Sequence, residues 1–89
     1  MELHALAEED ADLIRRLADE FRAELARQRK TAADFAVAIG ASPHTTGRRL
    51  KGETPGFNAV EMARGARFLG LSVATFWERA SASTAEAVA

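Results

Sequence analysis

The sequence predicts a small all-α protein, and three observations support this. The chain has 89 residues, a length typical of one small domain and too short for an enzyme with separate cofactor and substrate domains. Hydrophobic residues make up 47% of it and only two prolines occur, as in folded rather than disordered chains. Apolar residues recur every three or four positions, and no segment alternates polar and apolar residues as a strand does. We therefore expect about five helices around one modest core.

The first expected helix is long, from about residue 10 to 29. Its apolar side repeats at helical spacing through Leu13, Leu17, Phe21 and Leu25. Its acids lie early and its bases late, as the helix dipole favours. Residues 1–20 form an acidic extension of this helix. The extension either covers the flank of the core or, with Leu3 and Leu6, makes a dimer seam or docks a partner helix.

The next two expected helices are short and are separated by a tight turn. Thr31 is placed to N-cap the first, and Gly40 to end it. Ser42 is placed to N-cap the second, with Pro43 at its first helical position. This helix is expected to end at Gly52. The pattern predicts two helices joined by a turn of only a few residues.

A loop and two further helices complete the expected fold. Glu53-Thr54-Pro55-Gly56 has the composition of a turn. Asn58 is placed to cap a fourth helix, which Gly70 ends, and Ser72 begins a fifth. Residues 80–89 are small and polar, so we expect a flexible tail that adds nothing to the core.

The charge is strongly segregated along the chain. The net charge of −1 and the isoelectric point near 6.1 argue, taken whole, against a nucleic-acid-binding protein. Residues 1–20, however, hold seven acids and two bases, which gives −5, whereas residues 21–52 hold seven bases and two acids, which gives +5. Residues 53–89 give −1. A basic block therefore coincides with the two short helices.

Several classes of function find no support in the sequence. There is no cysteine, and His4 and His44 lie too far apart along the chain to suggest a metal site. No Gly-rich phosphate loop or nucleophile with a placed base occurs, so we expect no enzyme activity, no cofactor and no small-molecule ligand. No apolar run approaches the roughly 20 residues that span a bilayer, and the N-terminus is acidic, unlike a signal peptide. We expect a cytoplasmic protein that makes no contact with membranes.

A set of residues between positions 31 and 77 shares one register of helices and turns. They are Phe35-Ala36, Ile39-Gly40-Ala41-Ser42, Thr45, Arg48-Arg49-Leu50-Lys51-Gly52-Glu53, Phe57, Glu61-Met62, Ala66, Leu69-Gly70-Leu71-Ser72 and Phe76. In this register the chain resembles the helix-turn-helix domain of the lambda-repressor/Cro-like (XRE) family of phage and bacterial transcription regulators. The resemblance implies a compact five-helix fold, with residues 21–79 as the helix-turn-helix domain and an unusually long first helix. It also implies sequence-specific binding of double-stranded DNA by a repressor or Cro-like regulator.

The resemblance further implies which residues meet DNA. Pro43, His44 and Arg48 fall at base-facing positions of the second short helix. Arg48 can donate to guanine N7 and O6, His44 can donate to an acceptor in the groove, and Pro43 can make only an apolar contact, as with a thymine methyl. Expected phosphate contacts come from Thr31, Ser42, Thr45, Arg49 and Lys51.

Three positions depart from the family pattern. Thr46 stands where a large aliphatic residue usually packs under the recognition helix. Gly47 interrupts the middle of that helix, at a cost of about 1 kcal/mol relative to alanine. Ala32 replaces a glutamine that often contacts DNA, so that contact is missing here.

Other interpretations of the same residues stay open. The basic cluster could be an ordinary solvated face. The domain could instead be a protein-interaction module, such as an antitoxin or adaptor, which binds through the acidic first helix or through Trp77. Phe68 lies off the inward side of its helix, so Phe68 and Trp77 together could form an exposed patch for self-association as a homodimer.

Overall fold

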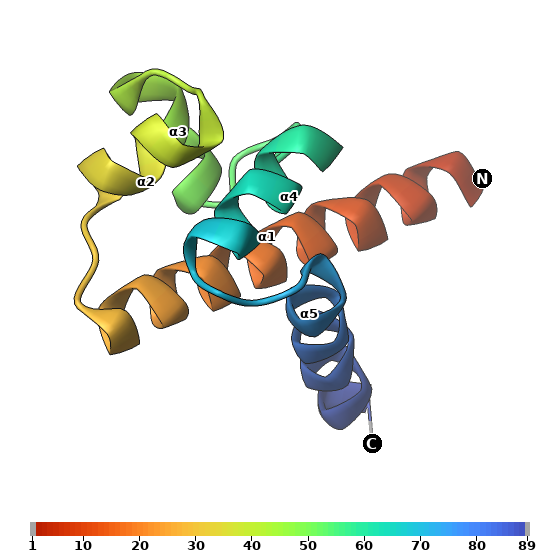
Figure 1. Ribbon diagram of the computed structural model, residues 1–89. Helices are drawn as coiled ribbons and strands as arrows, with labels where there is room; N and C mark the ends of the chain where they lie inside the picture. The colour runs from red at the N-terminus through yellow and green to blue at the C-terminus, as the bar shows by residue number, and fades with distance from the viewer. Residues whose placement is uncertain (1, 89) are drawn as a thin grey trace.

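The computed structural model describes the backbone of residues 2–88 and the side chains of residues 10–82. Within that backbone lie five helices and no strand (Figure 1). The helices are α1 (Glu2–Gln28), α2 (Ala32–Ile39), α3 (Pro43–Leu50), α4 (Ala59–Phe68) and α5 (Val73–Val88). The expectation of an all-α protein with about five helices is confirmed.

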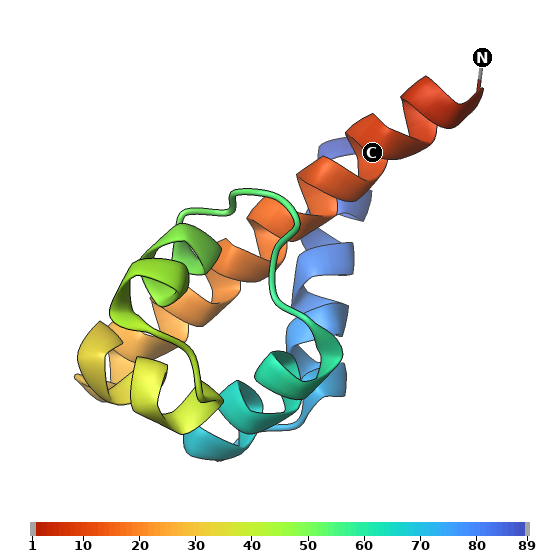
Figure 2. The same ribbon diagram turned by 90° about the horizontal axis from the view of Figure 1, so that it is seen from above.

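The two short helices lie together at one end of the molecule. Helix α2 packs against α3 and α4, whereas α1 packs against α3 and α5. The N-terminal turns of α1 project away on the side opposite α2 and α3, and α5 runs away from them in another direction (Figures 1 and 2). The acidic end of α1 therefore lies far from the short-helix pair.

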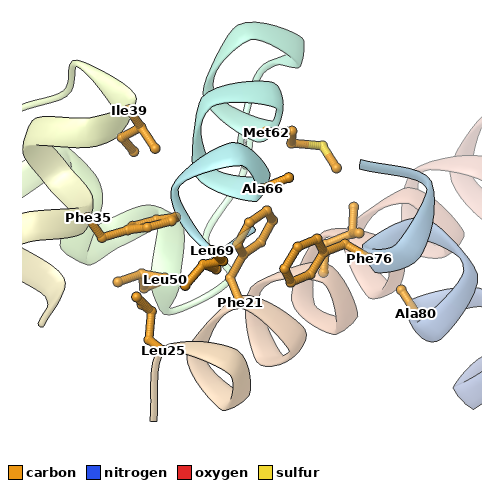
Figure 3. Packing of buried hydrophobic residues seen from close by; sticks show 11 residues of the cluster. Phe21, Leu25, Phe35, Ile39, Leu50, Met62, Ala66, Leu69, Phe76 and Ala80 are labelled. Carbon is orange, nitrogen blue, oxygen red and sulfur yellow. The ribbon is translucent and has the colours of Figure 1, made fainter. Parts of the chain in front are cut away.

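The core is built around three fully buried phenylalanines, Phe21 of α1, Phe35 of α2 and Phe76 of α5. The rings of Phe21 and Phe76 stack with their centroids 4.1 Å apart, and Phe35 lies tilted 5.6 Å from Phe21 (Figure 3). Such aromatic pairs add to the stability gained from buried area. The cluster also contains Leu17, Leu25, Ile39, Leu50, Met62, Ala66, Leu69 and Ala80. All five helices thus contribute to one core.

Polar side chains at the end of α1 tie this helix to α4 and α5. The carboxylate of Glu24 accepts hydrogen bonds from Arg27, Gln28 and Arg79 of α5. Gln28 also donates to the carbonyl of Leu69, and Lys30 donates to the carbonyl of Phe68, each over 2.8 Å. These bonds satisfy carbonyls at the C-terminal end of α4, which lack partners within the helix.

The ends of the chain differ from the sequence expectation. Helix α1 begins at Glu2 rather than near residue 10, and α5 continues to Val88 where a tail was expected. Ala80 is fully buried and belongs to the core cluster, because the packing of α5 against the rest of the fold leaves room for its methyl side chain inside the core. The core therefore reaches one residue into the expected tail.

The acidic extension also supplies part of the core. Leu17 and Ala18 are buried, and Leu13 packs against the core cluster. For these residues the structure agrees with the interpretation that the extension covers the flank of the core. The seam proposed for Leu3 and Leu6 lies outside the described side chains.

Candidate nucleic-acid interface

Helix α2 ends in a turn that requires glycine. Gly40 adopts φ +75° and donates its backbone N–H to the carbonyl of Ala36 over 3.0 Å. Side chains disfavour this left-handed conformation, and a β-carbon here would also lie 2.7 Å from the guanidinium of Arg64. The turn expected from Gly40 is present, and it sends the chain directly into α3.

The two N-caps in this unit place hydroxyl groups at its surface. Thr31 accepts a hydrogen bond from the backbone N–H of Asp34, and Ser42 accepts one from the N–H of Thr45, both over 3.1 Å. A hydroxyl that accepts a bond in a cap still has its own O–H to donate. Each of the two hydroxyls can therefore cap its helix and donate to an anion at the same time.

Helix α3 divides cleanly into a buried and an exposed face. Thr46 and Leu50 are buried, whereas Pro43, His44 and Arg48 are exposed. His44 and Arg48 are four residues apart, so they lie one above the other on the same face. All three expected base-contacting residues are thus exposed, and His44 and Arg48 share one face of α3. Thr45 beside them is half-buried, and Lys51 at the end of the helix is exposed.

The two arginines of α3 have different environments. Arg48 donates from Nε to Glu53 over 2.9 Å, and both side chains are about half exposed, at 51% and 47%. Arg49 donates from Nε to Glu61 of α4 over 3.2 Å, and these side chains are only 18% and 11% exposed. Arg49 therefore lies at the junction of α3 with α4 and does not share the exposed face of Arg48.

Glu61 has a second role at the start of α4. Its carboxylate accepts a bond from the backbone N–H of Asn58 over 3.0 Å, and the side chain of Asn58 accepts one from the N–H of Glu61 over 2.7 Å. This reciprocal capping box fixes the first turn of α4. One carboxylate thus anchors both the start of α4 and the end of α3.

A second left-handed glycine ends α3. Gly52 adopts φ +82° and donates to the carbonyl of Arg49, and Glu53 donates to the carbonyl of Arg48 over 3.2 Å. A β-carbon on Gly52 would lie 3.1 Å from Cα of Arg15. Helix α1 therefore packs closely behind this turn, which brings Glu53 back beside Arg48.

The sequence pattern does not single out Arg64, which the structure places next to the turn at Gly40. Its side chain is exposed, and it has no ion pair among the residues whose side chains are described. In the sequence, the one local feature that could have drawn attention to Arg64 is its position one helical turn after Glu61 on α4. Arg64 adds a free positive charge beside the expected interface.

The two aromatic residues expected to form a patch lie in different environments. Phe68 is half-buried, with its ring 6.2 Å from that of Phe35 and with the ammonium of Lys30 4.5 Å from its centroid. Trp77 is 48% exposed. Lys30 thus covers the ring of Phe68, and Trp77 is the more accessible member of the pair. Val37, which the sequence pattern does not single out, is 82% exposed.

Models of known protein families, curated proteins and solved structures were all compared with this chain, and none matches it. Within the described part of the chain, no helix has the length and apolar character needed to cross a membrane. The described side chains also contain no cluster of histidine and acidic residues that could hold a metal ion. The geometry of α2 and α3 is therefore the main guide to function.

Proposed function

We propose that this protein binds double-stranded DNA in a sequence-specific manner and regulates transcription, with α2 and α3 as a lambda-repressor-like helix-turn-helix. The observation that carries the proposal is the exposure of Pro43, His44 and Arg48 on α3, with His44 and Arg48 one turn apart on the same face. On the opposite face, the side chains of Thr46 and Leu50 are buried and hold α3 against the domain. A helix held in this way can enter a major groove without unfolding any part of the domain.

The chemistry of this face suits the edges of bases. An α-helix fits the major groove of B-DNA, where guanine offers two acceptors, O6 and N7. The guanidinium of Arg48 can donate to both at once. His44, one turn earlier, can donate one further bond, and the ring of Pro43 can make an apolar contact.

Groups around α3 suit the phosphate backbone. The hydroxyls of Thr31, Ser42 and Thr45 can donate to phosphate oxygens, and Lys51 and Arg64 carry exposed positive charges. Such contacts fix the register of the protein on the duplex but carry no sequence information. We assign Arg49 to holding α3 on α4, because its guanidinium is paired with Glu61.

The distribution of charge favours one orientation on DNA. The acidic N-terminal turns of α1 project away from α2 and α3 (Figure 1), so phosphates near α3 would not face them. A protein docked in this way would cover the groove and exclude a polymerase or a competing regulator. Repression by steric exclusion is the mechanism we propose.

Selection from a pool of random duplexes tests the proposal. The full chain should enrich a short motif that contains a guanine. Binding to the enriched duplex should weaken steeply with salt, because several basic side chains of the protein displace counterions from the phosphates. The exposed Trp77 offers the main alternative, a protein-interaction module. An apolar protein contact would respond little to salt. If no motif is enriched, DNA recognition by α3 is wrong.

A further inference from the structure

We propose that Glu53 is a positioning residue that sets the base specificity of α3 by holding Arg48 in a geometry ready for guanine. This inference rests on the proposed DNA-binding function. Arg48 donates its Nε–H to Glu53 over 2.9 Å, and its two terminal nitrogens have no hydrogen-bond partner among the described side chains. These two nitrogens are therefore left for another acceptor pair.

The geometry of the guanidinium group explains why a contact at Nε leaves Arg48 able to bind guanine. The group carries five N–H donors in a fixed planar fork, one on Nε and four on the two terminal nitrogens. The terminal nitrogens form a pair of parallel donors that matches O6 and N7 of guanine. A carboxylate that binds Nε fixes the plane of the fork without occupying that pair.

The backbone fixes Glu53 beside Arg48. The N–H of Glu53 donates to the carbonyl of Arg48 over 3.2 Å, and Gly52 between the helix and Glu53 adopts φ +82°. This turn packs against α1, because Arg15 lies directly behind Gly52. The two side chains thus sit on either side of a hydrogen-bonded turn that packs against α1.

The exposure of the pair points to binding rather than stability. Arg48 is 51% exposed and Glu53 47%, and ion pairs in such surroundings contribute little to the free energy of folding. A preset arginine, however, loses less side-chain entropy when it binds, so more of its interaction energy appears as affinity. Glu53 also adds negative charge near phosphates, which weakens binding to all sequences alike. The charge leaves the ratio of specific to nonspecific affinity unchanged, so only the presetting of Arg48 raises this ratio.

Three variants separate positioning from charge. Glu53→Ala removes both the acceptor and the charge, whereas Glu53→Gln removes the charge and keeps an oxygen that can accept from Nε. Glu78→Gln is the matched control, because Glu78 is an exposed acid on α5, which packs against α1 and α4. Each variant is compared with the parent in Kd for the enriched duplex and for the same duplex with its guanine replaced.

We expect Glu53→Ala to lower discrimination between the two duplexes about tenfold, which lies within the roughly 5- to 150-fold that a good bidentate contact can supply. Glu53→Gln should bind both duplexes more tightly yet keep most of the discrimination, and Glu78→Gln should match the parent. In an Arg48→Ala background, Glu53→Ala should change discrimination by less than twofold.

Opposite results would overturn the inference in distinguishable ways. If Glu53→Ala and Glu53→Gln tighten binding to both duplexes equally and keep full discrimination, Glu53 acts through its charge alone. If Glu53→Ala lowers discrimination equally with and without Arg48, it does not act through Arg48. If the parent itself does not discriminate between the duplexes, the proposed function fails, and this inference fails with it.

Discussion

Arg49 of α3 donates from Nε to the carboxylate of Glu61 of α4 over 3.2 Å, and both side chains are largely buried. Glu61 accepts the N–H of Asn58 with the same carboxylate oxygen. A single oxygen therefore connects the end of the proposed recognition helix to the first turn of α4. Because α4 also packs against α2, this contact helps to fix α3 relative to the rest of the domain.

Replacing Arg49 should therefore destabilise the fold. We expect Arg49→Ala to lower the free energy of unfolding by about 2 kcal/mol, because it leaves a largely buried carboxylate without its charged partner. Urea denaturation at neutral pH measures this loss. The control is Arg22→Ala, which removes an exposed pair with Asp19 on α1 and should cost less than about 0.5 kcal/mol. Equal small losses would show that Arg49 does not hold α3 in place.

Replacing Thr46 should stabilise the domain. Its hydroxyl is buried without a hydrogen-bond partner, so Thr46→Val should raise the free energy of unfolding by about 1 kcal/mol, since burying an unpaired polar group is costly. Thr45→Val on the same helix is the control, because Thr45 is only half-buried. It should bring no such gain. A loss of stability in Thr46→Val would mean that the hydroxyl has a partner.

Two helical glycines should respond to alanine with opposite signs. A β-carbon on Gly47 of α3 would meet nothing within 4 Å, whereas one on Gly65 of α4 would lie 2.9 Å from the ring of Phe35. Gly47→Ala should therefore raise the free energy of unfolding by about 1 kcal/mol through helix propensity. Gly65→Ala should lower it by about 1–3 kcal/mol through overpacking. Thermal unfolding of both variants gives the signs, and equal signs would contradict this packing.

The stability of the protein should fall in acid partly through Glu24. Hydrogen bonds from Gln28, Arg27 and Arg79 lower the pKa of Glu24 from its ordinary value of 4.5 to about 2. Since the folded state has the lower pKa, this contribution is complete above pH 4.5 and is lost as the pH falls from 4.5 towards 2. Urea denaturation between pH 7 and pH 3 should show a smaller loss for Glu24→Gln than for the parent. Glu78→Gln should behave like the parent, and identical slopes for all three would contradict the assignment.

Local features of this fold could be predicted from the sequence because they depend on neighbouring residues. Ser42, Pro43 and Asn58 mark helix starts through backbone chemistry that acts within three positions. Gly40 marks a helix end for the same reason. The apolar spacing likewise indicated the inward faces of the helices, including those of Phe21 and Phe35.

Features that depend on tertiary contacts could not be predicted. Arg49 and Lys51 are both basic residues near the end of the same helix, yet only Arg49 meets an acid of α4, twelve positions later. Ala80 resembles the small residues that follow it, and only the packing of α5 into the fold makes it part of the core. Arg64 reaches the turn at Gly40 because α4 packs on α2.

Methylation interference on the enriched duplex tests the central claim, that Arg48 on α3 reads a guanine in the major groove. Methylation of one guanine at N7 should block binding of the parent. Arg48→Ala should bind the unmethylated duplex more weakly by about 1–3 kcal/mol, and methylation of that guanine should not weaken its binding further. The control variant Arg22→Ala should bind like the parent and should lose binding on methylation as the parent does. The claim is contradicted if N7 methylation leaves the parent's binding unchanged, or if the parent and Arg48→Ala respond to it alike.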